Sequence, residues 1–114
     1  MDILPIINQT YEVYKFVLEL NNHLEKRWRF GLGLSLENTI LLLLQEVIMA
    51  KNAPKPLKAA YLLKAQSHLE IGTLKLRLYL ELKLVNETKI FQAQSKLKEI
   101  GRQLGGWLKS LNSA

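Results

Sequence analysis

Residues 56–84 read PLKAAYLLKAQSHLEIGTLKLRLYLELKL, and their apolar positions recur at the spacing of an α-helix. At about 1.5 Å per residue, a helix over this stretch is roughly 43 Å long. Pro56 suits the first turn of such a helix, where its missing N–H removes no hydrogen bond. A helix of this length needs other helices to cover its apolar side, so the stretch predicts a helical bundle.

The apolar residues of this helix fall on two stripes. The first stripe consists of Leu62, Ala65, Leu69, Leu76 and Leu80, and the second, on nearly the opposite side, of Ala60, Ile71, Leu74 and Leu78. A single bundle core covers only one stripe, and a subunit interface is the simplest cover for the second. The alternative is one broad buried face, with long Lys and Arg stems covering the remainder.

Three more segments have helical patterns, and none has the alternating pattern of a strand. The predicted helices span residues of about 5–27, 35–51, 56–84 and 88–111. Their short connections favour antiparallel neighbours. We therefore expect an all-α fold, an antiparallel up-down-up-down four-helix bundle, in which residues 1–114 form a single domain.

The segment between the first two helices contains two glycines, Gly31 and Gly33, which predict a loop over residues 28–34. Ser35 would then be the N-cap of the second helix. Gly101 and Gly105 lie four residues apart, so they share a face of the fourth helix. They predict close approach by another helix, or else a kink or helix end near Gly105.

The chain has 48% hydrophobic residues, no cysteine and a net charge of +6. Residues 55–114 carry 11 of the 16 lysines and arginines but only 4 of the 10 acids, so the second half is the basic one. The longest apolar run, residues 39–44, is too short to span a bilayer, and no signal peptide is recognisable. We expect a soluble cytoplasmic protein without disulfides or membrane contact.

The sequence offers no set of residues typical of catalysis. His23 and His68 lie on different helices, and the Glu-x-x-His pattern of di-iron bundles is absent because Leu20 and Ala65 precede them by three residues. No phosphate-binding loop or dinucleotide fingerprint is present. We therefore expect no enzymatic activity, no metal, no cofactor and no small-molecule substrate.

The basic residues suggest an anionic partner such as nucleic acid. Lys98, Arg102 and Lys109 share one face of the fourth helix, and Arg29 lies beside the aromatic residues Trp28 and Phe30. Basic side chains can bind phosphates, and aromatic rings beside them can stack on nucleobases. The alternative interpretation of each cluster is an ordinary solvated surface.

Three segments carry a family resemblance. Residues 29–38, RFGLGLSLEN, are similar to the R-F-x-x-G-x-x-I-E-N segment of a bacterial four-helix-bundle family. Residues 74–84 resemble the third helix of that family, and residues 99–109, EIGRQLGGWLK, resemble its C-terminal motif. The family includes accessory variability determinants of diversity-generating retroelements and proteins encoded in intervening sequences of ribosomal RNA genes.

The resemblance implies a homopentameric barrel with a basic surface. Such a barrel would bind a reverse transcriptase and RNA or DNA and would support mutagenic reverse transcription. The matching basic positions are Arg29, Lys75, Arg77, Lys83, Arg102 and Lys109, to which the helix-face argument adds Lys98. The alternative is a structural or protein-interaction bundle of the ribosomal-insertion branch, without a nucleic-acid role.

Overall fold

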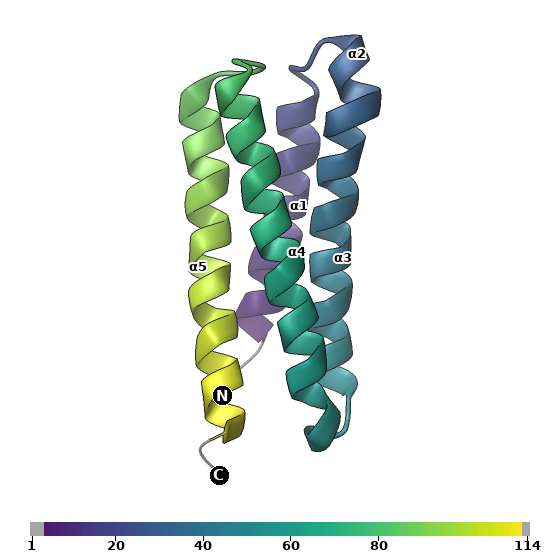
Figure 1. The fold of residues 1–114 in the computed structure, drawn as a ribbon, viewed down its shortest axis with the longest axis vertical. Coiled ribbons are helices and arrows are strands. Elements are labelled where there is room, and N and C mark those ends of the chain that lie inside the picture. The colour runs from purple at the N-terminus through teal and green to yellow at the C-terminus, as the bar shows by residue number, and fades with distance from the viewer. Residues whose placement is uncertain (1–3, 113–114) are drawn as a thin grey trace.

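The computed structural model describes residues 4–112, and all regular secondary structure in that range is helical. The four long helices are α1 (Leu4–Asn21), α3 (Leu34–Asn52), α4 (Lys55–Glu81) and α5 (Glu87–Asn112). They lie side by side along a body of 48 × 22 × 20 Å, and in Figure 1 the chain runs up α1, down α3, up α4 and down α5. The prediction of an all-α fold with four long helices is confirmed for these residues.

The predicted loop over residues 28–34 is wrong. The short helix α2 (Lys26–Trp28) continues through a π-helical segment, η1 (Arg29–Gly33), directly into α3. The first long helix ends at Asn21, earlier than predicted, and the chain reverses over residues 22–25. Ser35 consequently lies inside a continuous helix and is not an N-cap.

Gly33, the last residue of the π-helical segment, is closely packed. A Cβ atom at Gly33 would lie 2.8 Å from Leu24 Cδ1 and 3.2 Å from the Trp28 carbonyl oxygen. The backbone N–H of Leu34 donates to the carbonyl of Arg29, five residues earlier, which is the bond that defines a π-turn. Gly33 is therefore tightly packed within this turn, whereas a Cβ at Gly31 would meet nothing within 4 Å.

Asn21 joins three helices at this end of the bundle. Its side-chain Nδ2 donates to the Gly33 carbonyl at 2.9 Å and to Glu37 Oε2 at 2.8 Å. The Tyr79 hydroxyl of α4 donates to Asn21 Oδ1 at 2.6 Å. Asn21 and Tyr79 are both buried, and burial, followed by the charge of Glu37, raises the pKa of the Tyr79 hydroxyl far above its usual range. Tyr79 is therefore a neutral donor at any ordinary pH.

The helices enclose one core. Each long helix packs against two neighbours, with α3 and α5 each contacting α1 and α4. The fully buried side chains include Leu36, Leu43, Leu76, Leu97 and Leu104, and Trp107 covers one end of the core. The helix α5 continues past Gly101 and Gly105 to Asn112, so neither glycine ends it.

The two glycines of α5 differ in their surroundings. A Cβ at Gly101 would lie 3.4 Å from Leu69 of α4, which is an ordinary contact, whereas one at Gly105 would meet nothing within 4 Å. Close packing within the chain therefore does not require glycine at position 105.

The Tyr79–Asn21 bond makes a first test. Tyr79→Phe removes the donor and leaves the buried Asn21 oxygen without a partner, so unfolding in urea at fixed protein concentration should show a loss of about 1–3 kcal/mol. Tyr61→Phe, on the same helix but half-buried and without a hydroxyl hydrogen bond among the described residues, is the control and should change stability by less than about 0.5 kcal/mol. Equal effects of the two changes would contradict the role assigned to the hydroxyl.

Candidate nucleic-acid and subunit interfaces

Of the predicted basic residues, Lys75 is the one that hydrogen-bonds another long helix of the same chain. It is half-buried, and its Nζ donates to Ser35 Oγ at 2.6 Å, to Thr39 Oγ1 at 2.7 Å and to the Ser35 carbonyl at 3.3 Å. An ammonium group has three N–H donors, so these bonds to α3 use all of them. The geometry makes Lys75 a clamp between α3 and α4.

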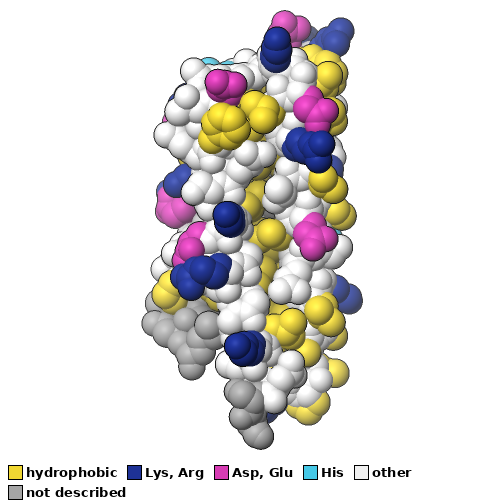
Figure 2. Space-filling model, turned by 60° about the vertical axis from the view of Figure 1, so that its left-hand side comes forward, with side chains coloured by type: hydrophobic (Ala, Val, Ile, Leu, Met, Phe, Trp, Pro, Cys, Tyr) yellow, Lys and Arg dark blue, Asp and Glu magenta, His cyan; other side chains and the backbone are white. Residues whose placement is uncertain are grey.

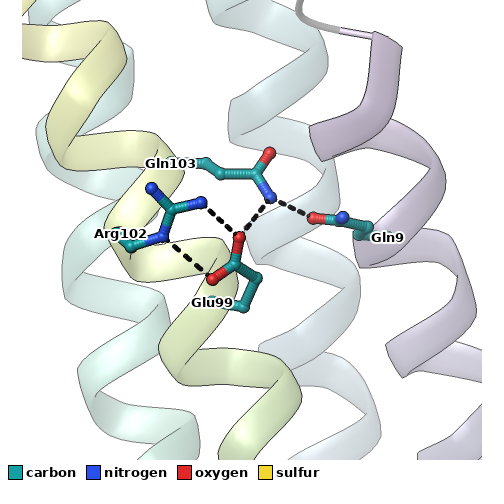
Figure 3. A network of polar contacts seen from close by, with 4 residues as sticks. All are labelled: Gln9, Glu99, Arg102 and Gln103. Atoms are coloured by element: carbon teal, nitrogen blue, oxygen red, sulfur yellow. Dashed lines mark hydrogen bonds and ion pairs between the residues drawn. The ribbon is translucent and has the colours of Figure 1, made fainter.

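Arg102 and Arg77 are exposed, but each forms an ion pair with a carboxylate one turn away. Arg102 donates twice to Glu99, at 2.6 and 2.9 Å, and Arg77 donates to Glu81 at 3.0 Å. Figure 3 shows that Gln103 also reaches Glu99 and connects this pair to Gln9 of α1. A phosphate would therefore compete with a carboxylate for both guanidinium groups.

Arg29 and Lys83 lie near the same end of the bundle. Arg29, at the start of the π-helical segment, donates through Nη2 to the Asn22 carbonyl at 3.2 Å. Lys83 has a left-handed backbone (φ 54°) just after α4, where helices usually place glycine. The bonds from Lys83 N to the Leu80 carbonyl and from Leu84 N to the Tyr79 carbonyl form a Schellman cap, so Lys83 terminates the helix as well as carrying a charge.

Lys98 and Lys109 project from α5 into solvent. Among the described residues, no carboxylate lies within ion-pairing distance of either ammonium group. The same helix carries two further exposed lysines that the sequence analysis did not single out, Lys89 and Lys96. Figure 2 brings the side of the molecule that holds α5 to the front and shows Lys and Arg side chains spaced along it. The four lysines lie on two sides of α5, with Lys89 and Lys96 beside α1 and Lys98 beside α4.

Hydrophobic side chains are exposed on the second stripe of α4. Ile71, Leu74 and Leu78 are 42%, 60% and 41% exposed, and Ala60 is also exposed. The first stripe packs inward, with Leu62, Ala65 and Leu76 buried. The single chain thus leaves the second stripe uncovered, and its role as a subunit interface stays a prediction.

The helix α3 extends this apolar surface in a way that the sequence analysis missed. Its inward side is buried, but its outward side exposes five large apolar side chains: Leu34, Leu41, Leu42, Ile48 and Met49. By length and composition the segment Lys26–Asn52 resembles a membrane span, yet a core helix of a soluble bundle has the same character. We call the exposed apolar residues of α3 together with the second stripe of α4 the α3–α4 apolar face.

Over the described residues, no group of three or more His, Asp or Glu side chains is placed to hold a metal ion. The furrow between α4 and α5 is lined by Leu69, Thr73 and Leu74 on one side and by Gln94, Lys98 and Gly101 on the other. Its lining also includes Glu70, so the furrow combines apolar side chains with one acidic and one basic residue, Glu70 and Lys98.

The Glu99–Arg102 pair gives a pH prediction. Hydrogen bonds from Arg102 first and Gln103 second lower the pKa of Glu99 to about 2. A lowered pKa means that the pair stabilises the fold above the ordinary Glu range and that this contribution is lost as the pH falls toward 2. NMR titration of the Glu99 carboxyl carbon should give a midpoint near 2, and Arg102→Ala should return it toward about 4.3. An unchanged midpoint in Arg102→Ala would disprove the pairing.

Comparison with known proteins identifies a family for this sequence. The family model described as bAvd-like matches residues 4–111, nearly the whole chain. No curated protein and no solved structure gives a significant match. The match covers the four long helices except the last residue of α5. The chain therefore belongs to the bAvd-like family.

Proposed function

We propose that this chain is a cytoplasmic accessory protein of the accessory-variability-determinant type. In this proposal the antiparallel bundle is one subunit of a ring-shaped homo-oligomer, a pentamer by resemblance. The assembly binds a reverse transcriptase and RNA or DNA and supports mutagenic reverse transcription without catalysing a reaction itself. Membership of the bAvd-like family is the observation that carries the proposal.

The distribution of exposed apolar and basic residues over the helices supports this proposal. The α3–α4 apolar face has the exposed hydrophobic side chains that a subunit interface requires. The lysines Lys89, Lys96, Lys98 and Lys109 lie on α5, where α3 does not cover them. Subunits that meet through α3 and α4 would leave α5 open to a partner, and repetition around a symmetry axis would multiply its charge.

The mechanism would be electrostatic tethering. Each lysine that neutralises a phosphate releases a condensed counterion, so binding strengthens steeply as salt is lowered. Arg77 and Arg102 would contribute less than their charge suggests, because each would first have to leave its carboxylate. The unpaired lysines of α5 would therefore dominate the contact.

One observation favours the alternative function, a bundle that binds only proteins. Lys75, Arg77 and Arg102, three of the seven predicted basic contacts, are engaged within the chain. The α3–α4 apolar face, by contrast, exposes large apolar side chains on two helices. A protein of the ribosomal-insertion type would use that face and would need no nucleic acid.

A salt titration separates the two functions. Lys98→Ala with Lys109→Ala removes two phosphate contacts, so the slope of log K against log salt should fall by about 1.4 for single-stranded RNA in gel-shift assays. Lys15→Ala is the control, because Lys15 is exposed on α1 and paired with Glu12 at 3.1 Å, and it should leave the slope unchanged. Absence of binding by the wild type even at low salt would refute the nucleic-acid role.

Assembly is tested separately. Leu74→Glu with Leu78→Glu places charge on the exposed stripe of α4, and light scattering should then show a smaller species than the wild type forms. The control is Phe91→Glu, which changes an equally exposed side chain on α5 and should leave the assembly intact. A wild type that is already monomeric would overturn the proposed assembly.

A further inference from the structure

A crevice opens at the end of the bundle where the chain passes from α1 to α2 and from α4 to α5, the upper end in Figure 1. Its volume of 380 Å³ is within the usual range of ligand pockets, about 300–1,000 Å³. Its lining residues are Glu25, Arg27, Trp28, Leu82, Lys83 and Leu84. We call this hollow the end crevice. It combines basic, aromatic and apolar side chains from two segments that are far apart in the sequence.

The side chain of Arg27 lies on the indole of Trp28. Its guanidinium carbon is 4.6 Å from the centroid of the Trp28 ring, which is the geometry of a cation–π contact. The indole is half-buried and packs against the core, so it gives the guanidinium a fixed support. Arg27 forms no ion pair among the described residues. Because a guanidinium is planar, contact with the indole on one side leaves its other side for a second flat group.

Lys83 supplies a second cation from the turn between α4 and α5. The Schellman cap fixes its backbone, so its side chain starts from a defined position in the crevice. Lys83 also borders a neighbouring hollow that contains Glu87, yet no carboxylate lies within ion-pairing distance of its ammonium among the described residues. Glu81, the last residue of α4, is paired with Arg77. The crevice thus has two cations and one carboxylate, Glu25.

We infer that the end crevice binds one nucleotide of a single-stranded nucleic acid, with the base stacked on Arg27 over Trp28 and a phosphate held by Lys83. The inference rests on the proposed function and adds a site for a base to the lysines of α5, which can hold only phosphates. Unpaired bases stack on aromatic rings and on arginine planes, whereas the bases of a duplex are already stacked on one another. The crevice therefore favours single strands.

The carboxylate of Glu25 favours a nucleotide over an acidic peptide. It can accept a hydrogen bond from the amino group of a base, as acidic side chains do from cytosine. A peptide rich in Asp and Glu offers the crevice no such donor in its side chains, and Glu25 would repel it. Such a peptide would also gain nothing from the flat surface of Arg27.

The test measures the fluorescence anisotropy of a labelled ten-nucleotide adenine RNA, single-stranded or paired with a ten-nucleotide uracil RNA. The wild type should bind the single strand more tightly than the duplex. Arg27→Ala removes the stacking surface, and Arg27→Lys keeps the charge without that surface. Each should weaken binding of the single strand at least about 5-fold, the lower end for loss of one stacked base.

Lys83→Gly separates the charge of Lys83 from its role in the helix cap. Glycine retains the left-handed backbone, so the fold should persist, and loss of one phosphate contact should lower the slope of log K against log salt by about 0.7. The matched control is Lys26→Ala, which removes an exposed base next to Arg27 that does not line the crevice. It should weaken binding less than any of the crevice variants does.

The indole N–H signals of Trp28 and Trp107 in NMR spectra give a second readout. The Trp28 signal should shift when the single strand is added, whereas the signal of Trp107, which is buried and lies outside the crevice, should not. This difference would not arise if Arg27 only stabilised the fold.

Three results would overturn this inference and leave the proposed function standing. They are equal losses of affinity in Arg27→Ala and Lys26→Ala, binding of the duplex as tight as that of the single strand, and displacement of the RNA by an equal concentration of ten-residue polyglutamate. The last result would identify a site for acidic peptides. Failure of the wild type to bind either RNA even at low salt would overturn the proposed nucleic-acid role and this inference together.

Discussion

The side-chain amide of Asn21 is the constraint on which the arrangement of the bundle depends. It accepts a bond from Tyr79 and donates to Gly33 and Glu37, so one buried group fixes α1, α3 and α4 relative to one another. A buried amide left partly unsatisfied costs more than an apolar substitute would, so the three helices have one favoured register. The π-helical turn is part of this arrangement, because the carbonyl of its last residue, Gly33, accepts a bond from Asn21.

With the register fixed, the outer surfaces divide by chemistry. The clamp from Lys75 to Ser35 and Thr39 ties α3 to α4, and both helices expose apolar side chains on their outer sides. The helix α5 packs against α1 and α4 and keeps its lysines outside. The exposed apolar stripe of α4 and the exposed lysines of α5 are thus on different helices.

The sequence predicts the four helices and the two stripes of α4 because both depend on periodicity within one segment. It fails at residues 28–34, where two glycines are typical of a loop and only the packing of Leu24 and Trp28 shows that Gly33 belongs to a helix. The pair Glu99–Arg102, at i and i+3, is readable from spacing. The bonds of Lys75 are not, because they depend on the register between two helices.

Agreement with a family motif does not distinguish contacts made inside the chain from contacts made with a partner. Lys75 matches the motif and is used by α3, while Lys83 matches it and closes a helix. Both positions would be retained for folding even in a relative that bound no nucleic acid. Lys98 neither bonds another helix nor closes one, since it lies at the α4–α5 furrow with no ion pair among the described residues. A basic residue with no role inside the chain is the better candidate for contact with a partner. The exposed lysines of α5 are therefore where contact with this protein's partner should be sought.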